Sequence, residues 1–145
     1  LLGGYFGSRL MENIREDKGF TYNIYSAGDM MLYDGYLYVA TEVGNEFVEP
    51  TLREIYHEFE RLQQEPVGEE ELNMVRNYLL GNLLTMLDGP FNISEIIKTQ
   101  VVENLPADHF EQLVQTIRSI TPAKLQRLAQ KYLQREAMWE VIVGV

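Results

Sequence analysis

The sequence contains no cysteine and only two histidines, His57 and His109, among its 145 residues. Without cysteine, neither a disulfide framework nor a thiolate metal site can form, and the redox compartment cannot be inferred. Neither H-E-x-x-H nor the inverted form H-x-x-E-H occurs, so the histidines have no zinc-ligand spacing. We therefore expect no metal and no bound cofactor in this chain, and we place both histidines on helix surfaces.

Cations and long apolar runs are also scarce. Lysine and arginine number 12 against 22 acidic residues, which gives a net charge of -10. Such a surface repels phosphate backbones, so we expect no nucleic-acid partner. No apolar run is long enough to cross a bilayer, so we expect no membrane partner. Many acids gather between Glu42 and Glu71, where we interpret them as solvated helix faces. The compartment stays open between cytoplasm and periplasm.

The composition and patterning predict one folded domain over residues 1–145. Hydrophobic residues make up 46% of the chain, with 11 glycines and 5 prolines, which is typical of a globular protein with a real core. The front of the chain is expected to form a helix over 4–17, a strand over 20–33 and a second strand over 36–43. Asp34-Gly35 is a hairpin signal between the two strands.

The rear of the chain is predicted to be mostly helical, with a short closing strand at 139–145. Gly81 lies inside one helix, where we expect close packing against a neighbour. The result is an α+β fold, with an antiparallel-rich sheet and helices layered on one face. Three strands are few for so many helices, so we expect the chain to be truncated at its N-terminal strands. One expected helix carries apolar residues from Leu52 to Leu62, and the next carries a stripe of Leu72, Val75, Leu79, Leu83 and Met86. Two more helices are expected over 91–104 and 107–119, and a last helix has its start signal at Thr121-Pro122.

Most candidate catalytic patterns in the sequence have a simpler structural interpretation. Gly3, Gly4 and Gly7 do not match a dinucleotide or phosphate-loop motif, and we expect Gly3 and Gly7 to let a helix approach its neighbour closely. The serines have no nearby histidine. Glu54 and Glu58 are four residues apart on a helix face that we expect to be exposed, so they receive no role.

Arg15 and Tyr22 form the one candidate pair for chemistry. Arg15 ends the first predicted helix and Tyr22 starts the next strand, so a turn at Lys18-Gly19 could bring the two side by side. A guanidinium and a phenol hydroxyl would suit a peptide carbonyl that gains negative charge in a transition state. An exposed arginine paired with Glu12 and a packed tyrosine are the structural alternative.

The front of the chain resembles the C-terminal domain of the insulinase/pitrilysin-type metallopeptidases, which include mitochondrial processing peptidase. The resemblance lies first in Gly3-Gly4-Tyr-Phe-Gly-Ser-Arg-Leu10 and in Asn13-Ile-Arg-Glu-Asp-Lys-Gly-Phe-Thr-Tyr22. It continues through the hairpin signal, the segments around Glu65-Pro66 and Asn82, and the last residues, and it covers essentially the whole chain.

This resemblance implies a metal-free half of a two-half enzyme. One half of the family fold carries the inverted zinc motif, and the other contributes an arginine and a tyrosine seven residues apart. Arg15 and Tyr22 have that spacing. The implied partners are a zinc-bearing N-terminal half, on the same chain or separate, and a peptide substrate. The zinc would lie in that partner half, so this chain alone should not hydrolyse peptides.

Two rival functions stay open from the sequence. A non-catalytic assembly subunit, of the kind of the core proteins of the bc1 complex, would keep the fold without the reaction. A stand-alone peptide-binding module would bind unfolded peptides without any partner half.

Overall fold

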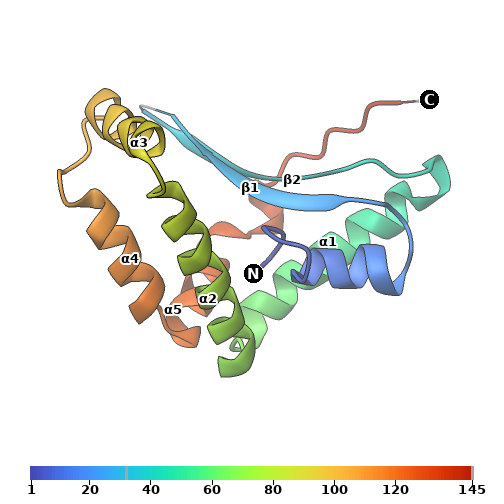
Figure 1. Ribbon diagram of the computed structural model, residues 1–145. Helices are drawn as coiled ribbons and strands as arrows, with labels where there is room; N and C mark the ends of the chain where they lie inside the picture. The colour runs from blue at the N-terminus through green and yellow to red at the C-terminus, as the bar shows by residue number, and fades with distance from the viewer. Residues whose placement is uncertain (32, 145) are drawn as a thin grey trace. The chain divides into compact units, whose positions relative to one another are not determined.

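The computed structural model describes residues 1–31 and 33–144, and it has an α+β fold (Figure 1). The chain divides into two compact units. One comprises Leu1–Val67 with Ala123–Val145, and the other comprises Gly68–Pro122. No helix in the described part of the chain is both long and apolar enough to cross a membrane.

The first unit contains an antiparallel β-hairpin, as the sequence predicts. Strands β1 (Ile24–Met30) and β2 (Gly35–Thr41) pair in register from Ile24 opposite Thr41 to Met30 opposite Gly35. Gly35 opens the second strand, so the connection is longer than the two-residue turn that Asp34-Gly35 suggests. Within it, the Met31 N–H donates to the Asp34 carbonyl at 2.7 Å, and residue 32 lies outside the described residues.

The chain before the hairpin is less helical than the sequence predicts. Residues 3–8 form bends and turns, and helical structure begins at residue 9 and continues as the π-helix η1 (Met11–Asp17). The N–H groups of Arg9 and Leu10 donate to the carbonyls of Leu1 and Leu2 at 3.1 and 3.0 Å. The first N–H groups of a helix have no partner within it. Here the carbonyls of Leu1 and Leu2 are those partners, which requires residues 1–8 to fold back as a loop. The expected helical stripe of Gly3 and Gly7 therefore does not form.

Gly3 nevertheless makes a close backbone approach, to strand β1. The Ser26 N–H donates to the Gly3 carbonyl at 2.9 Å, and a Cβ atom built on Gly3 would lie 2.5 Å from the Ser26 nitrogen. Only glycine fits such a contact without displacement of the backbone. The prediction that this glycine serves packing is confirmed, although its neighbour is a strand that follows it and the segment is not helical.

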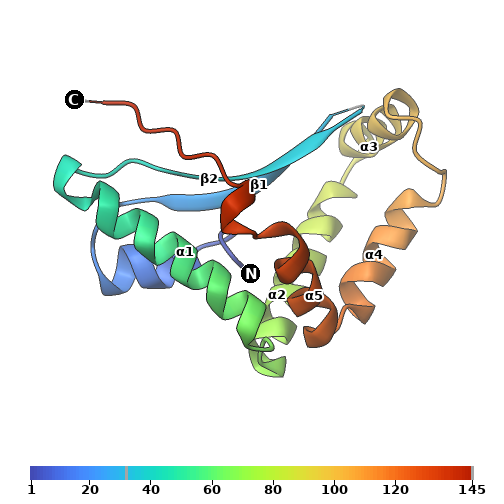
Figure 2. The ribbon, with the colours of Figure 1, turned by 180° about the vertical axis from the view of Figure 1, so that it is seen from behind.

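Helix α1 (Val48–Gln64) follows the short 3₁₀ turn η2 (Asn45–Phe47), and it lies on the same side of the hairpin as η1 (Figures 1 and 2). Its apolar residues recur at helical spacing, so one face is buried. The hairpin and the two helices thus share one core. The buried apolar side chains of this part are Leu10, Met11, Ile14, Ile24, Ile55, Tyr56, Phe59 and Leu62.

Helix α5 (Pro122–Tyr132) begins at the proline that the sequence marks as a start, and side-chain amides join it to α1. The Nε2 groups of Gln126 and Gln130 both donate to the Gln63 carbonyl, at 3.1 and 2.9 Å. In return, Gln63 Nε2 donates to the Leu133 carbonyl at 2.6 Å. These bonds satisfy carbonyl groups that helix ends leave unpaired.

The expected closing strand does not form in the described residues. After the 3₁₀ turn η3 (Arg135–Ala137), residues 138–144 are extended but pair with neither hairpin strand. Trp139 and Val143 are 94% and 92% exposed. A strand is defined by its pairing partner, and alternating β-formers alone do not supply one. The Tyr56 hydroxyl, which donates to Glu140 at 2.7 Å, ties this segment to α1.

The second unit consists of α2 (Glu69–Met86), α3 (Pro90–Val102) and α4 (His109–Ser119), and α2 packs against both of the others. The predicted apolar stripe of α2 is buried only at Leu72 and Val75, since Leu79 is 39% and Met86 48% exposed. The expectation for Gly81 is wrong, because an added Cβ would meet no described atom within 4 Å.

Candidate functional site

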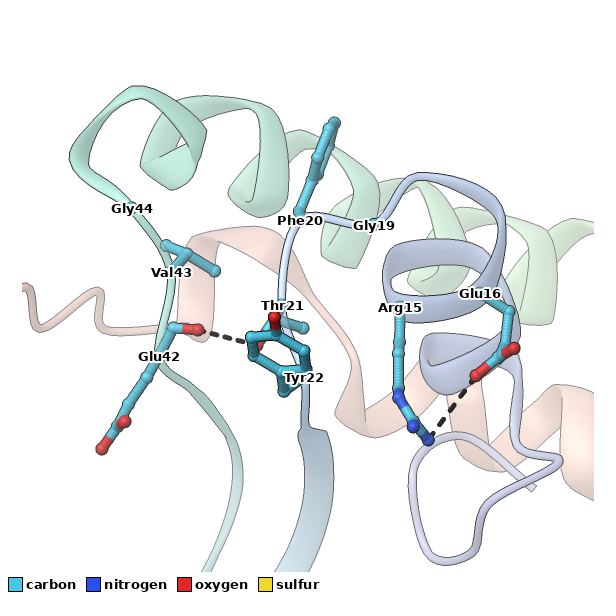
Figure 3. Close-up of a pocket in the computed structure, with 9 residues that line it drawn as sticks. All are labelled: Arg15, Glu16, Gly19, Phe20, Thr21, Tyr22, Glu42, Val43 and Gly44. Atoms are coloured by element: carbon cyan, nitrogen blue, oxygen red, sulfur yellow. Dashed lines mark hydrogen bonds and ion pairs between the residues drawn. The ribbon is translucent and has the colours of Figure 1, made fainter.

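One pocket of the first unit lies beside the candidate pair. It has a volume of about 540 Å³ and opens between the end of η1, the turn into β1 and the segment that follows β2 (Figure 3). Its walls combine backbone, charged groups and two apolar side chains. The lining residues are Arg15, Glu16, Gly19, Phe20, Thr21, Tyr22, Glu42, Val43 and Gly44.

Arg15 is held in place by two neighbours within its own unit. Its guanidinium lies 3.5 Å from a Glu16 carboxylate oxygen and 4.5 Å from the centre of the Phe6 ring. The stacking of a guanidinium on an aromatic face and its pairing with a carboxylate both limit its rotamers. The expected partner Glu12 is therefore replaced by Glu16. The side chain of Arg15 is still 30% exposed, so part of its donor surface is open to a ligand.

The turn at Lys18-Gly19 forms as the sequence predicts. Gly19 has a φ of 64°, the left-handed conformation that glycine adopts at low cost at the end of a helix. The Phe20 N–H donates to the Ile14 carbonyl at 3.0 Å, which closes the turn, and the Phe20 ring stacks on Phe47 with centroids 4.9 Å apart. The chain direction therefore reverses between Arg15 and Tyr22.

Tyr22 projects from a segment whose backbone is fixed on both sides. The Thr21 hydroxyl donates to the Glu42 carbonyl at 2.7 Å and accepts from the Thr41 hydroxyl at 3.1 Å. The Asn23 N–H also donates to the Thr21 hydroxyl, at 3.2 Å. The Tyr22 side chain itself is 95% exposed, so its hydroxyl is open to solvent or to a ligand.

The structure thus places both predicted site residues on one pocket. Figure 3 shows Arg15 and Tyr22 on the same side of the Gly19 turn, whereas the Phe20 ring points the opposite way. The guanidinium of Arg15 and the phenol hydroxyl of Tyr22 thus belong to side chains that line one pocket. Two such donors can bind an oxygen atom that carries partial or full negative charge. Their role in a reaction stays a prediction.

The described residues contain no group of three or more histidine, cysteine, aspartate or glutamate side chains that could hold a metal ion. The ligand set of a zinc site therefore does not fit this part of the chain. We derive no step through a metal bound by these residues.

One expectation about charged residues is wrong. Glu58, expected on an exposed face of α1, is only 1% exposed. Its carboxylate accepts a hydrogen bond from Asn13 Nδ2 at 2.8 Å and faces Arg61 at 3.0 Å. A buried carboxylate needs such partners. The partner Asn13 lies 45 residues away in sequence, so helical periodicity alone could not reveal this contact.

Comparison with known proteins gives relatives that are zinc proteases by description. A Bacillus subtilis (strain 168) protein described as "Uncharacterized zinc protease YmxG" is 27% identical over 89 residues, which cover 61% of this chain and 22% of that protein. The chain therefore spans about a fifth of the length of this curated relative.

Solved structures share the fold. A peptidase M16 inactive domain from Pseudomonas fluorescens superposes with a TM-score of 0.82 at 25% identity, over 92% of this chain and 32% of that one. A protease from Helicobacter pylori gives a TM-score of 0.81 at 20% identity, with the same coverage of 92% and 32%. In both cases this chain spans about a third of the solved chain.

The family comparison confirms the resemblance that the front motif indicates. The family model described as "Peptidase M16 inactive domain" matches residues 1–79, a range that contains both Arg15 and Tyr22 and more than half of the chain. The chain therefore belongs to the peptidase M16 inactive domain family.

Proposed function

We propose that this chain acts as the metal-free half of a zinc endopeptidase, where it binds peptide substrate and stabilises the oxyanion through Arg15 and Tyr22. The zinc belongs to a partner half, on the same polypeptide or on a separate subunit. The observation that carries the proposal is the shared pocket. A cation and a phenol seven residues apart in sequence line one cavity of about 540 Å³ in a domain of this family.

The chemistry of the two side chains suits a peptide carbonyl. When water attacks the carbonyl carbon, the oxygen gains negative charge, and donors placed before the reaction stabilise that charge more than they stabilise the substrate. Arg15 supplies a permanent positive charge and planar N–H donors, and Tyr22 supplies one O–H donor. Removing one donor of this kind typically costs about 10²–10³-fold in kcat.

Arg15 and Tyr22 differ in how far each side chain is fixed before substrate binds. Arg15 is already oriented by Phe6 and Glu16, so less rotamer entropy is lost when it contacts a substrate. Tyr22, at 95% exposure, reaches its bound position only when a substrate or the partner half covers it. The proposal therefore expects the complete site to assemble between the two halves.

The test is peptide cleavage by the complete protein, in which this chain is joined to or paired with its zinc-bearing half. Arg15→Ala and Tyr22→Phe should each lower kcat by about 10²-fold, with smaller changes in KM. Matched controls are Arg53→Ala, on the exposed side of α1, and Tyr33→Phe, whose side chain is 94% exposed near the hairpin end. Both controls should stay within about twofold of the parent.

Two outcomes would redirect the proposal. Unchanged kcat in both site variants would remove the oxyanion role, whereas no peptide cleavage by the complete parent protein would favour an assembly subunit without catalysis. Tight binding of unfolded peptides by this chain without a partner half, measured by calorimetry, would favour a stand-alone peptide-binding module.

A further inference from the structure

A cluster of polar side chains joins the helix that carries Arg15 to helix α1. Its centre is the Asn13 amide, which donates from Nδ2 to Glu58 at 2.8 Å and to Glu54 at 3.1 Å. The amide oxygen of Asn13 accepts from Lys18 Nζ at 2.6 Å, and Lys18 in turn lies 3.3 Å from Glu54. We call Asn13, Lys18, Glu54 and Glu58 the amide cluster.

The amide cluster connects three segments that position the candidate site. Asn13 belongs to η1, Lys18 to the turn after it, and the two glutamates to α1. Asn13 uses both N–H donors and its carbonyl oxygen, so few of its polar groups are unused. Because two of these bonds reach α1 and the third reaches the turn, the amide fixes both the orientation of η1 and the start of the turn.

Burial raises the free-energy cost of losing any of these hydrogen bonds. Glu58 is 1% exposed, and its other contact is Arg61, at 3.0 Å. A buried carboxylate that loses a donor is costly, so the structure around it is held strongly to one arrangement. Burial alone would raise the pKa of Glu54, but hydrogen bonds from Asn13 and Lys18 outweigh it and lower that pKa. Both carboxylates therefore have donors, Glu54 from Asn13 and Lys18 and Glu58 from Asn13 and Arg61.

The amide cluster lies on the side of η1 that faces α1, whereas the pocket lies on the side of η1 that carries Arg15. Asn13 and Arg15 are two residues apart on η1, which places their side chains on roughly opposite faces of the helix. Asn13 faces α1, whereas Arg15 lines the pocket. On the other side of the turn, Tyr22 follows Lys18 by four residues. A shift of η1 relative to α1 would therefore displace both pocket residues together.

We infer that Asn13 is a positioning residue of the proposed site, which acts on the reaction by holding Arg15 and the turn before Tyr22 against α1 through Glu58 and Glu54. This inference rests on the proposed function of Arg15 and Tyr22. Asn13 itself does not touch substrate. Misplacement of reacting groups by about 1 Å can lower a rate by about 10²-fold, so a partial displacement of the pair should have a measurable effect on kcat.

The first experiment measures kcat and KM for peptide cleavage by the complete protein. Asn13→Ala should lower kcat by about tenfold and leave KM within about twofold, since the displaced groups act mainly in the transition state. Asn13→Asp has nearly the same shape but removes both donors and adds a third carboxylate to the cluster. It should lower kcat at least as far, whereas a space-filling role for Asn13 would tolerate it. Asn82→Ala, at an exposed helix position, is the matched control and should leave kcat unchanged.

A combined variant separates positioning from general loss of structure. If Asn13 acts through Arg15 and Tyr22, then Asn13→Ala should have no more than about a twofold effect on kcat in a protein that already carries Arg15→Ala and Tyr22→Phe. An equal, tenfold loss in both backgrounds would overturn the inference. Hydrogen exchange should rise in residues 11–20 of Asn13→Ala and stay unchanged in the hairpin, which reports the release of η1 independently of activity.

The outcomes distinguish this inference from the proposed function. If Arg15→Ala lowers kcat but Asn13→Ala does not, the positioning role is wrong and the proposed function stands. If Arg15→Ala and Tyr22→Phe both leave kcat unchanged, both are wrong. If Asn13→Ala does not fold, Glu54→Ala replaces it, because Glu54 is 24% exposed and its loss leaves the Glu58 bond intact. That variant should lower kcat by about threefold, and an unchanged kcat would overturn the inference.

Discussion

Adding a single methyl group at Gly3 tests the contact between the N-terminal loop and β1. The Cβ atom of Gly3→Ala would lie 2.5 Å from the Ser26 nitrogen and 2.9 Å from its hydroxyl, whereas ordinary contact begins at 3.4 Å. The loop or the strand must therefore move by about 0.9 Å. Overpacking of this kind costs about 1–3 kcal/mol. Weakening of the Ser26–Gly3 hydrogen bond adds about 0.5–1.5 kcal/mol.

The expected loss for Gly3→Ala is about 2–4 kcal/mol in the free energy of unfolding, measured by urea denaturation. Gly4→Ala is the matched control. Gly4 is exposed, an added Cβ there meets no described atom within 4 Å, and its φ needs no glycine. Its free energy of unfolding should stay within about 0.5 kcal/mol of the parent. Equal stabilities for the two variants would refute the close approach of the loop to β1.

Three further predictions concern stability and ionisation. Gly81→Ala should raise the free energy of unfolding by about 0.5–1 kcal/mol, because the added methyl group meets open space and alanine favours helix; urea denaturation measures this, and a loss would mean that the position is packed. Burial and the hydrogen bond to Glu140 raise the pKa of Tyr56 above 10.0, so its stabilising contribution is complete below pH 10.0 and is lost as the pH rises through the folded pKa. Glu140→Gln should lower that pKa in an ultraviolet titration referenced to Tyr56→Phe, and an unchanged value would exclude the bond. The pKa of Glu54 is lowered from 4.5, so its contribution is present above pH 4.5 and is lost as the pH falls through the folded pKa. Lys18→Ala should flatten the acid side of the stability profile, and an unchanged slope would contradict the pairing.

Local signals predicted much of the fold because they depend on residues close in sequence. The left-handed turn at Gly19, the pairing of β1 with β2 and the start of α5 at Pro122 each follow from conformational preferences of a few residues. The arrangement of Arg15 and Tyr22 on one pocket depends on the same local turn. For this reason the placement of both residues beside one turn could be predicted from the eight residues 15–22, while their role in a reaction stays a prediction.

The features that the sequence did not predict depend on contacts that the periodicity of a helix or strand does not encode. Glu58 is buried because Asn13 and Arg61 satisfy its carboxylate, and residues 138–144 lack a strand because no described strand pairs with them. The first helix starts late because Leu1 and Leu2 supply acceptors from a loop. Periodicity records which face of an element is apolar, but it does not record which distant group will complete a hydrogen bond.

The most direct test of the central claim is the single-turnover rate of peptide cleavage by the complete protein carrying Tyr22→Phe. The substitution removes one oxygen atom from a side chain that is 95% exposed, so it should not change stability, and any loss reports on the reaction. The account predicts a rate lower by about 10²-fold, with Tyr33→Phe equal to the parent. A rate for Tyr22→Phe equal to that of the parent would contradict the role of this pocket in the reaction.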